Sequence, residues 1–313
     1  MGSAMGARPG APPGGTAPRA DRKGHAMVRL LETDVRTRDV LGWKGVHLFH
    51  FHGSSCSQKT RIVLNLKGVD WQAHPIDLPG GENLSERYLG INPRGLVPTL
   101  VIDGEIHIES NDIVSLIDRR FPVPRLIPEG REAEMAELLR HEDDLHLDLR
   151  TITFRYTQPR PRAPKSADAL ADYRARGSGT VRGSRDPNKT VEIAFWERIA
   201  RDGITDEAVR ASAARFRRSF EDLDRRLNAA PYIMGGQLSL ADIAWFIYVN
   251  RLILCGYPVE RLHPALYAWF GPLRERPEFA GEIAVPPEIR TAIDENHRRQ
   301  EAAGETLIDV AGL

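Results

Sequence analysis

The sequence is poor in residues that define several large classes of protein. Only two cysteines, Cys56 and Cys255, occur in 313 residues, which excludes a disulfide-stabilised scaffold and indicates a reducing compartment. No stretch approaches the ~18 uninterrupted apolar residues of a membrane-spanning helix, and no hydrophobic signal core is evident near the N-terminus. We therefore expect a cytoplasmic protein with no membrane partner.

An excess of charge of one sign is also absent. The chain has 43 Lys and Arg and 43 Asp and Glu residues, which argues against nucleic-acid binding through a broad basic surface. The balance conceals local asymmetry, because residues 124–149 carry a net charge of −5 and residues 150–189 a net charge of +7. We expect two opposed charged patches. With 41% hydrophobic residues, the chain can bury a sizeable core.

The length indicates two domains flanked by tails. The beginning of the chain is rich in Gly, Pro and Ala and has few large apolar side chains, so it cannot offset its ordering entropy by burial. The expected division is a disordered tail and lead-in at 1–43, an α/β domain at 44–125, a helical domain at 130–285 with a basic insertion at 150–189, and a C-terminal tail at 286–313.

Strand and helix patterns alternate in the first domain. Short apolar runs, helical spacings and an Asp103-Gly104 turn predict the order β-α-β-α-β-β-α, with a hairpin around that turn. The expected elements are strands at 46–50 and 71–76, helices at 57–67, 84–89 and 111–121, and the two hairpin strands within 97–108. This order predicts one compact α/β unit.

Strand signals disappear after this domain and helical periods take over. Ser239 and Asp242 have the spacing of a helix-capping box, which makes Asp242 a structural cap rather than an acid catalyst. The expected helices span 132–149, 190–199, 206–227, 239–254 and 263–276. The second domain is therefore predicted to be an all-α bundle.

Cys56 is placed where the first strand turns into the first helix. Unpaired N–H groups and the helix dipole favour a thiolate there, and Lys59 and Arg61 add positive charge. A small buried cysteine that only packs is the alternative. The lack of a second cysteine three residues on argues against dithiol exchange, so Cys56 is predicted to be a nucleophile or a mixed-disulfide partner.

Two further segments fit a ligand-binding edge. Pro98 begins an inner strand, where a cis bond after Val97 would turn polar groups toward a ligand, although an edge-strand proline is an equal alternative. Ser110 follows Glu109 at the start of a helix, where N–H groups attract an anion, and simple capping would also account for this serine.

Together these segments resemble the three ligand-binding stretches of a cytosolic glutathione transferase. The matching stretches are Ser54-Ser55-Cys56-Ser57, the run from Asn92 through Val97-Pro98 to Leu100, and Glu109-Ser110-Asn111-Asp112. The resemblance implies an α/β thioredoxin-like domain followed by an all-α domain, glutathione as co-substrate and a homodimer. It also implies roles in detoxification or aromatic catabolism.

The resemblance implies particular roles for these residues. Ser54 would activate the glutathione thiolate and Cys56 would attack a glutathionyl adduct to form a mixed disulfide. The remaining predicted glutathione-binding residues are Ser55, Val97, Pro98, Glu109 and Ser110. Within the superfamily the Ser-x-Cys turn is similar to the zeta class, which includes maleylacetoacetate isomerases, and more similar to tetrachlorohydroquinone reductive dehalogenases. Leu96 stands where zeta proteins usually carry Gln, which weakens the isomerase interpretation.

The helical domain is expected to bind a small electrophile, either aromatic, quinone-like or halogenated. Arg155, Tyr156 and Arg160 are the predicted substrate-binding residues because they lie nearest the bundle within the basic insertion. That insertion is interpreted either as a lid or as a solvated surface loop. Isomerase or β-etherase chemistry, another thiol such as mycothiol or ergothioneine, and a non-catalytic binding module remain the alternatives.

No metal site is predicted. His141 and His146 are five residues apart and so do not share a helical face. His50, His52 and Cys56 have zinc-binding chemistry, but zinc would conflict with a thiol role for Cys56. Cys255 is predicted to lie in the core.

Overall fold

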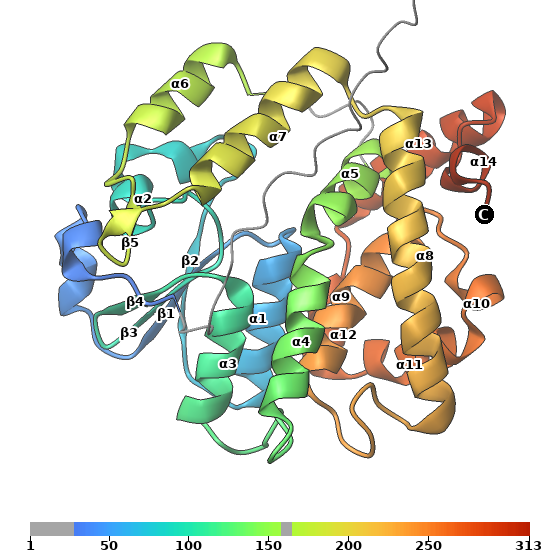
Figure 1. The fold of residues 1–313 in the computed structure, drawn as a ribbon, viewed down its shortest axis with the longest axis horizontal. Helices are drawn as coiled ribbons and strands as arrows, with labels where there is room; N and C mark the ends of the chain where they lie inside the picture. The colour runs from blue at the N-terminus through green and yellow to red at the C-terminus, as the bar shows by residue number, and fades with distance from the viewer. Residues whose placement is uncertain (1–27, 158–164) are drawn as a thin grey trace, which may run out of the picture.

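The computed structural model describes residues 28–157 and 165–313, and it contains an α/β domain beside a helical domain (Figure 1). The first part of the predicted tail, 1–27, lies outside the described residues. The predicted fold class, a thioredoxin-like domain followed by an all-α bundle, is confirmed.

The α/β domain is built on a four-stranded mixed sheet. Strand β1 (Val46–His50) pairs in parallel with β2 (Gln72–Pro75) and antiparallel with β3 (Thr99–Ile102), which pairs antiparallel with β4 (Glu105–His107). Its helices are α1 (Ser55–Leu66), α2 (Glu86–Ile91) and α3 (Ser110–Arg120), with a short 3₁₀ helix, η3, at Glu82–Leu84. The element order therefore agrees with the sequence pattern.

Strand β1 divides the core of this domain between the two faces of the sheet. Val46 and Leu48 pack with α1, α3 and the helical domain, whereas Phe49 packs on the opposite face with Tyr88 of α2. Successive side chains of a strand point to opposite faces, so a single strand anchors both layers. The first of these clusters is continuous with the bundle core, which joins the two domains into one body.

Residues 28–43 differ from the expected lead-in because they belong to the folded α/β domain. Leu30, Val35 and Val40 are buried in its second core cluster, and the Leu30 amide donates to the Ile106 carbonyl at 2.9 Å. This segment contains the 3₁₀ helices η1 (Glu32–Asp34) and η2 (Arg38–Gly42). Its few large apolar side chains are sufficient to dock it on the sheet.

The helical domain surrounds one buried helix. Helix α9 (Leu240–Leu254) is buried along most of its length, including Trp245 and Phe246. The remaining helices are α4 (Glu132–Asp143), α5 (His146–Tyr156), α6 (Ala167–Ala175), α7 (Asn188–Asp202), α8 (Asp206–Ala229), α10 (Val259–Leu262), α11 (Pro264–Arg274), α12 (Pro277–Ile283), α13 (Pro287–Ala303) and α14 (Leu307–Ala311).

The expected helix at 132–149 is divided into α4 and α5. The chain turns at Asp144 and Leu145, and His146 begins the second helix. Leu138, Leu145 and Leu149 are all buried, so the apolar period continues across the turn and conceals it. The break sets which face α5 presents to the α/β domain.

Two further expectations are corrected. The insertion contains a two-stranded hairpin of β5 (Thr180–Val181) and β6 (Ser184–Arg185), although no strand was expected after the first domain. Residues 286–313, expected as a C-terminal tail outside the helical domain, form α13 and α14. Leu307 is buried in the main core, and the Asn296 side chain donates to the Tyr156 carbonyl at 2.9 Å, so tertiary contacts stabilise a sequence that is largely polar.

Asp242 organises the start of α9, as the capping pattern predicts. Its carboxylate accepts from the Ser239 amide and hydroxyl, the Ile233 amide and the Trp269 indole, at 2.6 to 3.0 Å. The side chain is fully buried, so each of these donors depends on it.

We expect Asp242→Ala to lower the free energy of unfolding by about 3 kcal/mol, because several buried donors would lose their acceptor. Asp309→Ala is the matched control, since Asp309 makes an equivalent but exposed capping box with Thr306 and should cost about 1 kcal/mol or less. Denaturant unfolding of both variants measures the difference. Equal losses would contradict a special role for the buried cap.

Candidate functional site

Ser54 lies at the turn between β1 and α1 and caps the helix. Its Oγ accepts from the Ser57 amide at 3.3 Å, so the hydroxyl proton is free to be donated elsewhere. Ser54 and its neighbour Ser55 line a pocket between the two domains. A hydroxyl at a helix N-terminus can stabilise an anion such as a thiolate.

Cys56 lies in the first turn of α1 and is half-buried. Its Sγ lies 3.9 Å from His146 Nδ1 on α5. Burial alone would raise the pKa of the Cys56 thiol, but His146 and Lys59 outweigh it, so the pKa falls below the ordinary value. The structure therefore gives Cys56 the environment of a reactive thiol.

The backbone of Val97 is available to a ligand. The Val97–Pro98 peptide bond is cis, and neither the amide nor the carbonyl of Val97 has a backbone partner in the described part of the chain. Val97 lines the same pocket as Ser54. Since such groups pair with a peptide as a strand does, this segment can hold an extended peptide.

Glu109 and Ser110 lie at the N-terminus of α3. Glu109 has a positive φ of 69°, its carboxylate pairs with Arg94, and about a third of its side chain is exposed. Ser110 is buried. Neither residue lines the pocket itself, so the structure groups Ser54, Ser55 and Val97 there and leaves this pair at a separate helix end.

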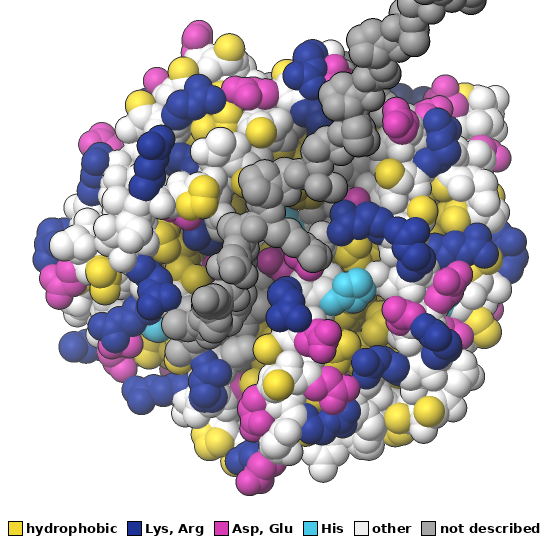
Figure 2. Space-filling model, in the orientation of Figure 1, with side chains coloured by type: hydrophobic (Ala, Val, Ile, Leu, Met, Phe, Trp, Pro, Cys, Tyr) yellow, Lys and Arg dark blue, Asp and Glu magenta, His cyan; other side chains and the backbone are white. Residues whose placement is uncertain are grey.

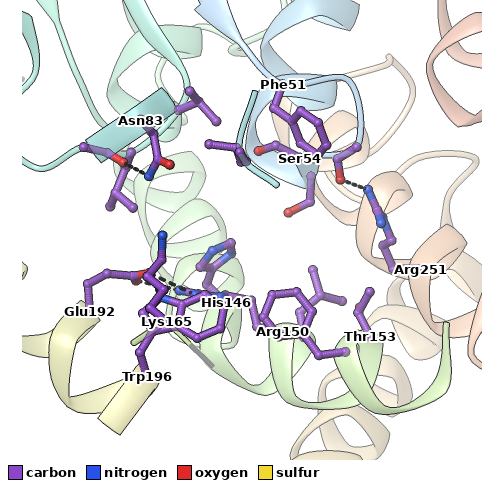
Figure 3. A pocket seen from close by; sticks show the side chains of 18 residues that line it. Phe51, Ser54, Asn83, His146, Arg150, Thr153, Lys165, Glu192, Trp196 and Arg251 are labelled. Atoms are coloured by element: carbon purple, nitrogen blue, oxygen red, sulfur yellow. Dashed lines mark hydrogen bonds and ion pairs between the residues drawn. The ribbon is translucent and has the colours of Figure 1, made fainter. Parts of the chain in front are cut away.

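The pocket has a volume of about 160 Å³. A cavity of about 150 Å³ accommodates benzene, so it has room for one aromatic ring. Figure 3 shows the α/β domain contributing Phe51, Ser54 and Asn83 on one side and α5 contributing His146, Arg150 and Thr153 on the other.

The wall opposite Ser54 was not predicted from sequence. His146, Leu149, Arg150 and Thr153 follow the i, i+3, i+4, i+7 spacing of one helical face. That stripe is a detectable signal once α5 is known to begin at His146. Phe154 and, from α7, Glu192 and Trp196 complete the wall.

Arg150 is fixed in this wall by several contacts. It forms a two-pronged ion pair with Glu192 at 2.6 and 3.0 Å, and its guanidinium lies 4.1 Å from the Phe195 ring centroid. Burial would raise the pKa of Glu192, but Arg150 and the Trp196 N–H lower it. The wall is therefore pre-organised and combines charge with aromatic surface.

Two of the predicted substrate-binding residues lie elsewhere. Arg155 donates to the Ile204 carbonyl and pairs with Asp206, and Tyr156 is fully buried in the main core. Neither lines the pocket, because both project from other faces of α5 than the His146 stripe. Arg160 lies outside the described residues.

The insertion is docked on the α/β domain. Asp186 pairs with Arg94 through Nε and Nη2 at 2.7 and 2.9 Å, and the Tyr173 hydroxyl donates to the Arg94 carbonyl. On the other side, the Asp34 carboxylate accepts from the Thr180 hydroxyl at 2.7 Å. Helices α6 and α7 consequently lie above the sheet in Figure 1.

Ion pairs partly neutralise the expected opposed charge patches among the described residues. Arg174 and Arg176 pair with Glu197 and Asp172, and on the acidic side Glu134 pairs with Arg131 and Arg226. Figure 2 accordingly shows both signs of charge interspersed over this face. Local pairing among the described residues therefore reduces the charge asymmetry that the linear sequence suggested.

The other candidate clusters do not converge. His50 Nδ1 lies 3.0 Å from Arg61 Nη1, and burial with nearby positive charge lowers the pKa of His50 to about 4. Cys255 is buried, which raises the pKa of its thiol to about 12. Within 28–157 and 165–313 no group of three His, Cys, Asp or Glu residues is arranged to hold a metal ion.

Comparison with known proteins identifies both domains. Residues 53–120 match the model of the glutathione S-transferase N-terminal domain and residues 206–271 that of the C-terminal domain. No helix in the described ranges has the length and apolarity needed to cross a bilayer.

Similar curated proteins include isomerases that match over a short segment and a dehalogenase that matches over most of the chain. A maleylacetoacetate isomerase from Pseudomonas aeruginosa is 41% identical over 83 residues, or 26% of this chain and 39% of that protein, and one from Mus musculus is 39% identical over 84 residues. The chain thus spans about two fifths of the length of these relatives. A tetrachloro-p-hydroquinone reductive dehalogenase from Sphingobium chlorophenolicum is 25% identical over 249 residues, covering 77% of this chain and 96% of that protein.

Solved structures share the fold. A β-etherase from a Sphingobium strain superposes with a TM-score of 0.63 at 23% identity, covering 76% of this chain and 98% of that one. A theta-class glutathione S-transferase from Xanthomonas axonopodis with glutathione bound gives a TM-score of 0.53 at 22% identity, with 78% and 99% covered.

Proposed function

The chain belongs to the glutathione S-transferase family, with both of its domains, and from this premise we propose that it is a glutathione-dependent enzyme that removes a substituent reductively from a small aromatic electrophile. The observation that carries the proposal is that Ser54 and Val97, whose backbone has no backbone partner within 28–157 and 165–313, line a pocket of aromatic size, and that Cys56 lies 3.9 Å from the pocket-lining His146. The reductive dehalogenase relative, which aligns along most of the chain, supports the reaction type.

Glutathione would be held along the α/β domain. The amide and carbonyl of Val97 would pair with its cysteinyl backbone, and Ser55 and Pro98 would shape the adjoining surface. Glu109 and Ser110 would hold the γ-glutamyl end, where the Glu109 carboxylate remains about a third exposed beside Arg94. Ser54 would donate its free hydroxyl proton to the thiolate.

The reaction would proceed through two sulfur transfers. The glutathione thiolate first displaces a halide from the ring, which forms a carbon–sulfur bond. The Cys56 thiolate then attacks that sulfur to form a mixed disulfide, and the ring carbon leaves with the electron pair and takes a proton. A second glutathione thiolate releases oxidised glutathione, so two glutathiones supply the two electrons that convert C–halogen into C–H and hydrogen halide.

The electrophile would lie against the α5 wall. Phe154 and Trp196 offer aromatic surface, and Arg150 offers a positive charge that favours a phenolate. These residues replace Arg155 and Tyr156 in the proposal, since those two face away from the pocket.

Because the reaction consumes reduced thiol, the proposal retains the cytoplasmic location. A homodimer stays a prediction that light scattering can test.

Isomerisation remains the second candidate because of the similarity to maleylacetoacetate isomerases in the N-terminal part. Exposed Leu96 lines the pocket at its edge and offers no polar group to an acidic dicarbonyl substrate. Isomerisation would return glutathione unchanged, β-ether cleavage would leave a thioether, and the reductive reaction would yield oxidised glutathione. Product identity with glutathione, mycothiol and ergothioneine as alternative thiols separates these outcomes.

Ser54→Ala tests the thiol site. We expect kcat/KM for glutathione conjugation to fall by about 100-fold, because one donor to the developing thiolate is removed, and its pH profile to shift upward. Ser85→Ala is the control, since Ser85 caps α2 with the same geometry at 3.2 Å but lies outside the pocket. Equal activity losses in the two variants would mean that Ser54 acts only as a helix cap.

A further inference from the structure

A histidine from the helical domain lies beside the nucleophilic cysteine of the α/β domain. His146 begins α5, lines the pocket and places Nδ1 3.9 Å from Cys56 Sγ, although the two residues are 90 positions apart in the chain. We infer that His146 takes the proton from Cys56 and holds it as a thiolate–imidazolium pair. The inference rests on the proposed function for the role of Cys56 and deepens it by naming the base.

The imidazole is oriented by a second partner. The Tyr248 hydroxyl on α9 lies 3.2 Å from the same Nδ1. When Nδ1 is protonated it donates, and the hydroxyl oxygen accepts. Tyr248 therefore holds the ring beside Cys56, and the negative charge of the Cys56 thiolate favours the charged form of His146.

The charges around the pair favour proton transfer from sulfur to nitrogen. Burial would lower the pKa of His146, but the adjacent Cys56 raises it, while the pKa of Cys56 is lowered. Lys59 reinforces the thiolate, and Glu142 partly opposes it. The ionisable and charged groups facing the pair are Lys59 from α1, Glu142 and Asp143 from α4, Arg150 from α5, Glu192 from α7, and Tyr248 and Arg251 from α9.

In the proposed reaction the imidazolium of this pair would stabilise negative charge and keep a proton at the site. In the first step the glutathione thiolate at Ser54 attacks the ring close to the Cys56 thiolate, and the two negative charges raise each other's pKa. An imidazolium within 4 Å offsets that repulsion. It also retains the proton that the departing ring carbon requires, so no outside acid is needed for the balance of the step.

The test measures Cys56 alkylation by iodoacetamide against pH, without glutathione or electrophile. We expect a midpoint below the ordinary value of about 8.5 in the wild type, and His146→Asn should raise it by about one unit and slow alkylation near pH 7 roughly ten-fold. His141→Asn is the control, because His141 contacts Ser219 at 3.0 Å instead of Cys56, and its midpoint should be unchanged. Equal midpoints for wild type and His146→Asn would overturn the inference.

A reciprocal measurement covers the case in which His146→Asn does not fold. NMR titration of His146 in the wild type and in Cys56→Ser should show a lower midpoint in the variant, because the thiolate that stabilises the imidazolium is gone. An unchanged midpoint would overturn the pair. Neither experiment uses glutathione, so failure of the pair and failure of the proposed reaction are separately visible.

Discussion

Cys56→Ser is expected to stop the reductive reaction and leave the glutathionyl–ring conjugate as the accumulating product. Serine cannot form a disulfide, so the second sulfur transfer has no nucleophile, and oxidised glutathione and the reduced ring should fall by at least about 1,000-fold. The first step, which depends on Ser54, should continue. Chromatography with mass detection of the products of a chlorinated hydroquinone measures both.

The matched control for this prediction is Cys255→Ala. Cys255 is the other cysteine of the chain and is buried in the core, so its removal should leave the product ratio unchanged. Normal reductive turnover by Cys56→Ser would show that the cysteine only tunes the pocket. It would redirect the account toward conjugation, isomerisation or ether cleavage.

Lys59→Met is expected to destabilise the fold strongly. The Lys59 ammonium and the Glu142 carboxylate are almost completely buried, at 2% and 1% exposure, with 2.9 Å between Nζ and Oε2, and Nζ also donates to Asn111 at 2.6 Å. Removing one partner leaves an uncompensated buried charge, which costs about 4 kcal/mol. Denaturant unfolding measures the loss.

The double variant Lys59→Met/Glu142→Leu separates charge burial from packing. Replacing both ions with apolar groups of similar size should recover most of the lost stability. Arg174→Met is the surface control, since Arg174 and Glu197 form an exposed pair and its loss should cost less than about 1 kcal/mol. A double variant as unstable as the single one would contradict the electrostatic explanation.

Much of the α/β domain was predictable because its signals are local. The Asp103-Gly104 turn adopts positive φ at both residues, 50° and 85°, as a tight hairpin turn requires. The capping pattern of Ser239 and Asp242 likewise needs only neighbouring residues. Ser54 follows β1, and Val97 precedes β3. Because these two strands are antiparallel neighbours, both segments lie at the same end of the sheet and reach one pocket, as the predicted order of elements implied.

The helical wall was not predictable for a physical reason. The turn at Asp144 and Leu145 changes which side chains of α5 face the pocket. The buried leucines keep a helical spacing across this turn, so the sequence pattern does not reveal it. Proximity in sequence therefore favoured Arg155 and Tyr156, whereas the structure turns Arg150 and His146 toward the pocket. The partners that fix them, Glu192 and Tyr248, are 42 and 102 residues away, beyond any local pattern.

The central claim is that Cys56 forms a disulfide with glutathione during turnover. Mass spectrometry of peptides from protein quenched in a single turnover, with a chlorinated hydroquinone and limiting glutathione, tests it directly. The account predicts one glutathione on the Cys56 peptide, none on the Cys255 peptide, and loss of the adduct when more glutathione is added. Formation of the reduced ring product while Cys56 stays unmodified at every time point would contradict it.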